Sequence, residues 1–264
     1  MPDLTEIRAR RPEAIAQAAA ARTRPAELPE RLMVIAADHP GRGMLLGDRG
    51  DLLDRLVLAL SRPGVNGVLG TPDILEDLLL LGALDDKVVV GSMNRGGLHG
   101  ATWSLDDRFT AYDAAAIARN RFEGGKMLLH LDTDDPLTAA TLAGCAHAVS
   151  GLAERRLLAL VEPFWRDASA EGAMKAISVA SALGTSSAYT WLKVPVVEEM
   201  ERVMTASTLP ALVLGGGGPA DYDAWDRALA LPTVRGLVIG RSLLYPADGD
   251  VAGAVDIATG LVAA

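Results

Sequence analysis

Cysteine and lysine are both scarce in this chain of 264 residues. The single cysteine, Cys145, cannot form an internal disulfide, and it lies in a predicted helix among alanine and leucine residues. This usage is typical of a reduced protein, and we expect Cys145 to be a buried packing residue rather than a nucleophile. Only four of the 25 basic residues are lysines, and two of them, Lys126 and Lys193, lie inside apolar strand-like runs.

Several kinds of segment are missing as well. No apolar run reaches the roughly 20 residues that span a bilayer, because stretches such as Leu52 to Leu60 contain charged residues. The amino-terminal segment has no hydrophobic signal core and carries Asp3, Glu6 and Glu13, which argues against a secretory or transit peptide. The net charge is -9 and no cluster of basic residues stands out, which argues against a nucleic-acid partner. We therefore expect a cytoplasmic protein that binds neither nucleic acid nor membrane.

From residue 31 onward, short apolar runs alternate with amphipathic stretches of helical spacing. The runs predict eight strands, at Leu32–Ala37, Gly67–Leu69, Lys87–Gly91, Lys126–Leu131, Leu157–Val161, Tyr189–Val194, Ala211–Leu214 and Gly236–Ile239. The amphipathic stretches predict eight helices, at Asp51–Leu60, Pro72–Leu81, Asp113–Asn120, Leu137–Leu152, Glu171–Leu183, Glu198–Ala206, Asp221–Leu229 and Ala252–Val262. This order predicts an α/β fold, a single-domain (β/α)8 (TIM) barrel over residues 31–264. A doubly wound sheet is the alternative, but no glycine-rich fingerprint follows the first strand.

Residues 1–30 form a predicted helical arm that precedes the barrel. It contains the alanine-rich run Ala14–Ala21 and then two helix breakers, Pro25 and Pro29. We expect the arm to pack across the bottom of the barrel or against a partner subunit, and we expect a homo-oligomer. A second unusual segment is the long loop Met93–Thr110, which carries several charged residues and is of a length typical of functional or disordered loops.

Charged residues in or just after four strands are candidates for catalysis, because barrels of this class build their active sites at the carboxyl ends of the strands. They are Asp38 after the first strand, Lys126 in the fourth, Glu162 at the end of the fifth and Lys193 in the sixth. Together they would supply an amine nucleophile, a second cation that favours its neutral form, and two carboxylates that move protons.

Each of these residues also has a structural interpretation. Lys193 alone is more typical of a lysine paired with Glu162 at the barrel mouth, and Lys126 lies early in its strand and could point to the barrel bottom. Asp38 precedes a Pro-Gly turn and could act only as a turn residue, while Glu162 could simply end its strand before a proline. His130 lies four positions after Lys126 in the same predicted strand, so both side chains would point to the same face. A hydrogen-bonded core histidine is nevertheless the favoured interpretation of His130.

Two glycine-bearing segments after the seventh and eighth strands predict a phosphate site. Glycines let backbone N–H groups approach an anion, and Arg241 adds a fixed positive charge. A flexible turn is the alternative interpretation of the glycine run. The candidate binding residues, with two more from the barrel mouth and the long loop, are Gly215, Gly216, Gly217, Gly240, Arg241, His39 and Arg95.

These motifs resemble the class I (Schiff-base) aldolases of the deoxyribose-phosphate and tagatose-bisphosphate aldolase superfamily, including fructose-bisphosphate aldolase relatives. Ala36-Ala37-Asp38, Gly125-Lys126-Met127, Leu160-Val161-Glu162-Pro163 and Leu192-Lys193-Val194-Pro195 resemble the motifs of four strands in that order, and the glycine segments resemble its phosphate loops. Strand three departs from some relatives, because Ser92-Met93-Asn94 stands where they carry another lysine.

The resemblance implies a lyase that needs no cofactor and no metal. Lys193 would attack the ketone of a small phosphorylated sugar and Glu162 would transfer protons. Lys126 would keep Lys193 partly neutral, and Asp38 would act on the hydroxyl that is deprotonated during carbon–carbon cleavage. The products would be dihydroxyacetone phosphate and an aldehyde. A likeness to aldolases of inositol breakdown would suggest 6-phospho-5-dehydro-2-deoxygluconate as substrate.

Two other functions fit the same residues. A phosphosugar isomerase or epimerase would use Glu162 and Asp38 as acid and base, with the lysines as electrostatic clamps. A non-catalytic sugar-phosphate sensor would keep the phosphate loops, although it has no need of two lysines in strands.

Overall fold

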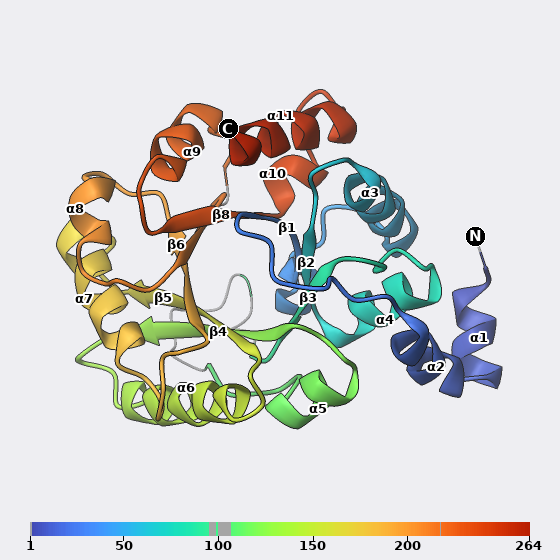
Figure 1. Cartoon of the computed structure of the whole chain (residues 1–264), viewed down its shortest axis with the longest axis horizontal. Helices are drawn as coiled ribbons and strands as arrows, with labels where there is room; N and C mark the ends of the chain where they lie inside the picture. The colour runs from blue at the N-terminus through green and yellow to red at the C-terminus, as the bar shows by residue number, and fades with distance from the viewer. Residues whose placement is uncertain (1, 95–98, 100–106, 217) are drawn as a thin grey trace.

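The computed structural model describes residues 2–94, 99, 107–216 and 218–264, and these form a closed barrel of eight parallel strands in the order β1 to β8 (Figure 1). The strands are β1 (Leu32–Ala37), β2 (Gly67–Gly70), β3 (Val88–Ser92), β4 (Gly124–Leu131), β5 (Leu158–Trp165), β6 (Thr190–Pro195), β7 (Ala211–Leu214) and β8 (Val234–Ile239). The predicted (β/α)8 barrel is therefore confirmed.

Helices follow the strands and surround the barrel (Figure 1). They are α3 (Arg49–Ser61), α4 (Pro72–Leu80), α5 (Ala114–Arg119), α6 (Thr138–Ala153), α7 (Ala170–Ser181), α8 (Met200–Met204), α9 (Tyr222–Leu229) and α11 (Val251–Ala263). Two short elements that the sequence analysis did not predict lie directly after strands: the 3-10 helix η1 (His39–Arg42) after β1, and α10 (Arg241–Leu244) after β8.

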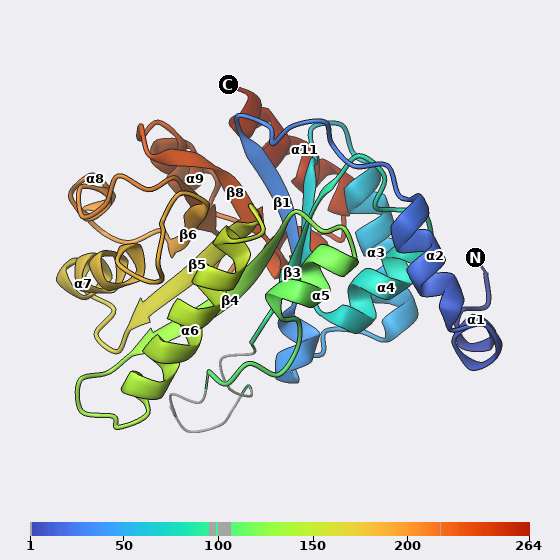
Figure 2. The ribbon, with the colours of Figure 1, turned by 60° about the horizontal axis from the view of Figure 1, so that its bottom comes forward.

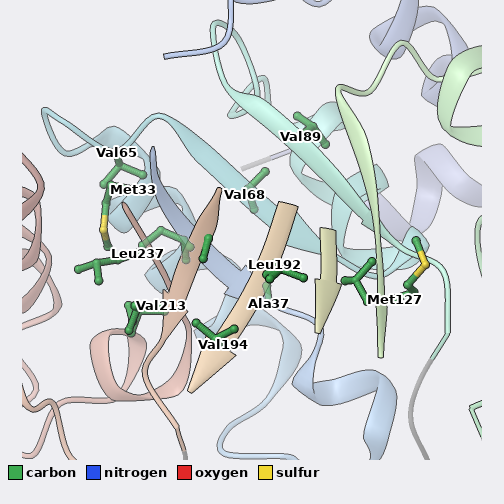
Figure 3. Close-up of a cluster of buried hydrophobic side chains, with 14 of the residues drawn as sticks. Met33, Ala37, Val65, Val68, Val89, Met127, Leu192, Val194, Val213 and Leu237 are labelled. Atoms are coloured by element: carbon green, nitrogen blue, oxygen red, sulfur yellow. The ribbon is translucent and has the colours of Figure 1, made fainter. Parts of the chain in front are cut away.

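The alternation of side chains along each strand separates two apolar layers. An inner layer fills the barrel and consists of Leu32, Val34, Ala36, Leu69, Val88, Val90, Leu158, Leu160, Leu212 and Val238. The outer layer packs against the helices, and Figure 3 shows part of it, with Val68, Val89 and Met127 on neighbouring strands. Asp38, Lys126, Glu162 and Lys193 have the parity of the inner layer in their strands. The sequence therefore directs all four side chains into the barrel.

The fifth strand is longer than predicted. β5 continues through Pro163 to Trp165, and Leu131 of β4 pairs with Trp165 at its end. On the other side, its pairing with β6 stops at Val161 and Leu192. A proline is tolerated in such a one-sided extension because its missing N–H breaks no ladder hydrogen bond there. The interpretation of Glu162 as a residue that ends its strand is therefore wrong.

The amino-terminal arm consists of α1 (Leu4–Arg10) and α2 (Glu13–Ala21), which lie outside α4 at the right of Figure 1. Arg8 forms ion pairs with Glu76 and Asp77 of α4, at 2.8 Å each. The segment from α2 to β1 runs along the top of the barrel in Figure 2, at the end where the strands begin. There the buried Arg22 forms an ion pair with Glu123 at 3.0 Å. The arm therefore packs against the amino-terminal end of the barrel strands, away from the catalytic candidates.

Hydrogen bonds connect the described ends of the long loop after β3 to β4. The Asn94 side chain donates hydrogen bonds to the carbonyls of Asp107 and Leu128, at 3.0 and 2.8 Å. The Asp107 carboxylate accepts the His130 N–H at 2.7 Å and contacts His130 Nδ1 at 2.9 Å. His130 is therefore a buried, hydrogen-bonded residue, as expected. Arg95 lies outside the described residues.

Cys145 is fully buried in α6, in agreement with its predicted packing role. Within the ranges that the structure describes, no helix is both long and apolar enough to cross a membrane.

Candidate active site

A cavity of about 330 Å³ lies at the carboxyl ends of the strands. All four predicted catalytic residues line it, together with the described phosphate-site candidates and His39. The full lining is Ala36, Asp38, His39, Arg42, Met44, Lys126, Glu162, Phe164, Lys193, Pro195, Leu214, Gly215, Gly216, Val238, Gly240 and Arg241. The structure therefore brings together residues that are far apart in the chain.

Glu162 connects the two lysines. Its Oε1 atom lies 3.0 Å from Lys193 Nζ, and its Oε2 atom lies 2.5 Å from Lys126 Nζ. Lys126 also donates a hydrogen bond to Asp38 Oδ2 at 3.1 Å. The four side chains thus form one chain of contacts, Asp38 to Lys126 to Glu162 to Lys193, of which Lys126, Glu162 and Lys193 are buried.

Strand register explains this arrangement. Val161 pairs with Leu192, so Glu162 and Lys193 are the next residues on two neighbouring strands. Leu128 pairs with Glu162, which places Lys126 one inner layer below Glu162 on β4. Its long side chain reaches up to the two carboxylates, so Lys126 does not pair at the bottom of the barrel.

The charges of this cluster stabilise one another against the cost of burial. Burial opposes the charge on Lys126, but Asp38 and Glu162 outweigh it and raise the pKa of the Lys126 ammonium above its ordinary value. Burial likewise opposes the carboxylate of Asp38, but Lys126 and Lys193 hold the pKa of Asp38 well below its usual range. The same two lysines outweigh burial at Glu162 and lower its pKa. At neutral pH both carboxylates are therefore ionised.

The lining residues that follow β7 and β8 have features of an anion site. Gly216 has φ of +67°, a conformation that favours glycine, and it follows Gly215 after β7. A Cβ atom on Gly240 would lie 2.5 Å from the Ala36 carbonyl oxygen, so only glycine fits between β8 and β1. Arg241 lines the cavity beside these backbones. Gly217 lies outside the described residues.

His39 is buried beside Asp38 and lies edge-on to Tyr245, with ring centroids 6.4 Å apart. Burial lowers the pKa of His39 to about 4; Asp38 opposes this shift and Arg241 adds to it. The imidazole is therefore neutral at pH 7, and it can donate one hydrogen bond and accept another.

Three residues that line this cavity, and Ser242 beside Gly215, were missed by the sequence analysis. Arg42, Met44 and Phe164 line the cavity. The Ser242 hydroxyl is buried and makes no hydrogen bond within the described residues, and a Cβ atom on Gly215 would lie 3.1 Å from it. Phe164 lies two positions after Glu162, so the two side chains point to the same side of β5. This alternation can be recognised in the sequence only once β5 is known to continue past Pro163. Ser242 directly follows the predicted Gly240-Arg241 pair.

The barrel is similar in fold to the barrels of fructose-bisphosphate aldolases. An archaeal fructose-1,6-bisphosphate aldolase, solved with its catalytic lysine covalently bound to the carbinolamine intermediate, aligns with a TM-score of 0.69 at 15% identity over 95% of this chain and 100% of that chain. The fructose-bisphosphate aldolase of Slackia heliotrinireducens aligns with a TM-score of 0.66 at 16% identity, over 94% of this chain and 89% of that one. At these identities the likeness is one of fold alone.

The chain belongs to the Cgl0159-like family, whose model matches residues 30–259. The crystal structure of Cgl0159 from Corynebacterium glutamicum is 48% identical and aligns with a TM-score of 0.94, over 98% of this chain and 95% of that one. No curated protein sequence matches the chain.

Proposed function

We propose that the protein is a class I aldolase, which cleaves or forms a carbon–carbon bond in a phosphorylated ketose or keto-sugar acid. The observation that carries the proposal is the contact of 3.0 Å between Lys193 Nζ and Glu162 Oε1 inside the cavity. It gives a buried amine a carboxylate that can take up its proton. The glycine backbones and Arg241, which line the same cavity, supply donors for a phosphate on the same molecule.

Imine formation is the first part of the proposed reaction. Lys193 transfers a proton to Glu162, and the free amine attacks the substrate ketone to give a carbinolamine. Glu162 returns the proton to the departing hydroxyl, which leaves as water, and a protonated imine remains on Lys193. Lys126 stays charged, because two carboxylates stabilise its ammonium, and it can orient substrate hydroxyls.

Cleavage is the second part. Asp38 accepts the proton of the hydroxyl on the carbon next to the bond that breaks, and the aldehyde forms at that carbon. The electron pair of the broken bond flows into the protonated imine and gives an enamine. Protonation of the enamine and addition of water then release dihydroxyacetone phosphate and restore Lys193. The imine is the electron sink, so the proposed reaction uses no cofactor.

We propose 6-phospho-5-dehydro-2-deoxygluconate as the substrate to test first. Its ketone stands beside the phosphorylated carbon, and cleavage between its third and fourth carbons gives dihydroxyacetone phosphate and 3-oxopropanoate. A bisphosphorylated ketose is the second substrate to test, because it places a ketone beside a phosphate in the same way.

The test is product analysis of the purified protein with both substrates, with Lys193→Arg as the variant. Arginine keeps the charge beside Glu162 but cannot form an imine. We expect two fragments from the wild-type protein and no detectable turnover by Lys193→Arg, while circular dichroism and the melting temperature show that the variant is folded. A single rearranged product would identify an isomerase or epimerase instead, and binding without any product would identify a sensor.

A further inference from the structure

A second cavity adjoins the anion site, and we call it the outer cavity. Its volume is about 660 Å³, which lies within the usual range of small-molecule sites. Its walls come from α10, α11, the start of α9 and the segment between η1 and α3. Figure 1 shows α10 beside α11 and α3, against both of which it packs. Arg241 of α10 lines the outer cavity and the candidate active site alike, so the two cavities meet at this residue.

Two polar groups at this junction have no partner among the residues that the structure describes. The Arg241 guanidinium makes no ion pair or hydrogen bond there. The Ser242 hydroxyl makes no hydrogen bond either, although the residue is only 7% exposed and lines the outer cavity. A buried hydroxyl without a partner is costly, so a ligand atom that binds it would be stabilised. A guanidinium and a hydroxyl are donors that suit the oxygens of a phosphate.

These two donors lie in the wall between the cavities. Ser242 lines the outer cavity, and its Oγ atom would lie 3.1 Å from a Cβ atom on Gly215, which lines the candidate active site. A phosphate bound at this wall can therefore belong to a ligand in either cavity. Two such ligands would exclude each other, because both would place an anion beside Arg241.

The middle of the outer cavity is apolar. Leu46 and Ile257 line it and are 51% and 52% exposed, a high exposure for aliphatic side chains. Tyr222 and Tyr245 add two aromatic rings to the lining. A ligand that covers these side chains would remove apolar surface from water, and a ring-bearing group suits the tyrosines.

Two exposed carboxylates lie at the solvent side of the outer cavity. Asp248 Oδ1 accepts the N–H of Asp250 at 3.0 Å, and Asp250 Oδ1 accepts the N–H of Gly253 at 2.9 Å. Each carboxylate thus uses one oxygen to hold the turn before α11. Carboxylates repel a second anion but accept hydrogen bonds from hydroxyl groups. The part of a ligand that reaches this side should therefore be uncharged and carry hydroxyls.

We infer that the outer cavity binds a phosphate monoester of an uncharged group that carries a ring and hydroxyls, of which a nucleoside monophosphate is the type. The phosphate lies on Arg241 and Ser242, and the ring covers Ile257. This ligand competes with the phosphorylated substrate for Arg241 and so inhibits the enzyme. Binding in the outer cavity goes beyond the proposed function, and only the competition rests on it.

The test is calorimetric titration with adenosine monophosphate, with adenosine, which lacks the phosphate, and with methyl phosphate, which lacks the ring. The proteins are the wild type, Ser242→Ala, Ile257→Glu and the control Leu58→Glu. Leu58 lies on α3, is 42% exposed and does not line the outer cavity, so the control makes the same chemical change elsewhere. The adenosine monophosphate titration is repeated with dihydroxyacetone phosphate present, and borohydride trapping of that ligand reports the state of the candidate active site.

We expect adenosine monophosphate to bind the wild type at least about 10-fold more tightly than adenosine or methyl phosphate, since each of these lacks one set of contacts. Ser242→Ala and Ile257→Glu should each weaken its binding by about 10-fold or more, while Leu58→Glu matches the wild type. Ile257→Glu should still form the trapped adduct, and dihydroxyacetone phosphate should raise the apparent Kd of adenosine monophosphate.

The inference is overturned if adenosine monophosphate does not bind, or if Ile257→Glu binds it as tightly as Leu58→Glu does, which would place the ligand elsewhere. An apparent Kd that does not change when dihydroxyacetone phosphate is trapped on the protein would overturn the competition. Absence of any trapped adduct on the wild type would overturn the proposed function, whereas the titrations without that ligand would still decide whether the outer cavity binds the nucleotide.

Discussion

The carboxylate of Glu162 lies 3.0 Å from the amine of Lys193, on neighbouring residues of two adjacent strands. The same carboxylate contacts Lys126 through its other oxygen. Glu162 therefore touches both buried lysines, Lys126 and Lys193.

Glu162→Gln keeps the shape of the side chain but removes its charge and its ability to accept a proton. We expect kcat to fall by about 10²- to 10⁴-fold, the usual contribution of general acid–base catalysis. We also expect the free energy of unfolding to fall by about 3–5 kcal/mol, because two buried lysines lose a counter-charge. Steady-state kinetics and urea unfolding measure the two effects.

The matched control for this variant is Glu171→Gln on α7. Glu171 pairs with Lys175 at 2.9 Å, but both side chains are exposed, and such pairs contribute only about 0.3–0.5 kcal/mol. A Glu162→Gln protein as active and as stable as this control would show that Glu162 is neither a proton carrier nor a structural counter-ion.

Lys126→Met removes one of the two cations that keep Asp38 and Glu162 ionised, and Lys193 remains. Burial is then opposed less strongly, so the pKa of each carboxyl rises, and the acid limb of the kcat/KM profile should move to higher pH. Lys126→Arg keeps the charge and should leave the acid limb near its wild-type position. Equal acid limbs in Lys126→Met and the wild type would mean that Lys126 does not control these carboxylates.

His39 makes the protein sensitive to mild acid. Its folded pKa of about 4 lies below the ordinary value of 6.5, so between these pH values the unfolded chain binds the proton first. The His39 contribution to stability is fully present above pH 6.5 and is lost as the pH falls toward 4, by about 3 kcal/mol at most. Urea unfolding at pH 7 and pH 4.5 should show a smaller loss in His39→Gln than in the wild type. Identical losses would contradict the buried, neutral state of His39.

Gly240→Ala tests the close approach of β8 to β1. The new methyl group would lie 2.5 Å from the Ala36 carbonyl oxygen, so the backbone beside Arg241 must shift. We expect KM for a phosphorylated substrate to rise and stability to fall by about 1–3 kcal/mol.

Gly260→Ala is the control for that substitution, because it lies in α11 with open space around it. There alanine should be neutral or stabilising by up to about 1 kcal/mol. If Gly240→Ala binds phosphorylated ligands as tightly as Gly260→Ala does, the segment at Gly240 is not part of a phosphate site.

Part of this site was readable from the sequence, because barrels of this class build their sites at the carboxyl ends of the strands. The strict order of strands and helices predicted the barrel, and the places of Glu162 and Lys193 in or at the ends of strands made them candidates for one cavity. The direction of Lys126 was ambiguous because β4 begins at two glycines, Gly124 and Gly125, which carry no side-chain pattern. Only the register with β5 shows that its amine reaches up to Glu162.

Other parts depend on contacts that no local pattern encodes. Pro163 concealed the extension of β5, because a proline usually marks a strand end or an edge. The η1 turn that carries Arg42 into the cavity is positioned by Thr71 and by His99, which belong to other βα units. The α10 turn has four residues, too few for a helical period to be recognised. The sequence predictions for Arg95 and Gly217 fall outside the described residues and stay predictions.

The most direct test of the account is reductive trapping of the imine. The protein is incubated with dihydroxyacetone phosphate and borohydride, digested, and its peptides are analysed by mass spectrometry. We predict one adduct, on the peptide that contains Lys193, and none on that peptide in Lys193→Arg or at Lys126 in either protein. Bound ligand with no adduct on any lysine, or an adduct on Lys126 instead, would contradict the assignment of Lys193 as the Schiff-base residue.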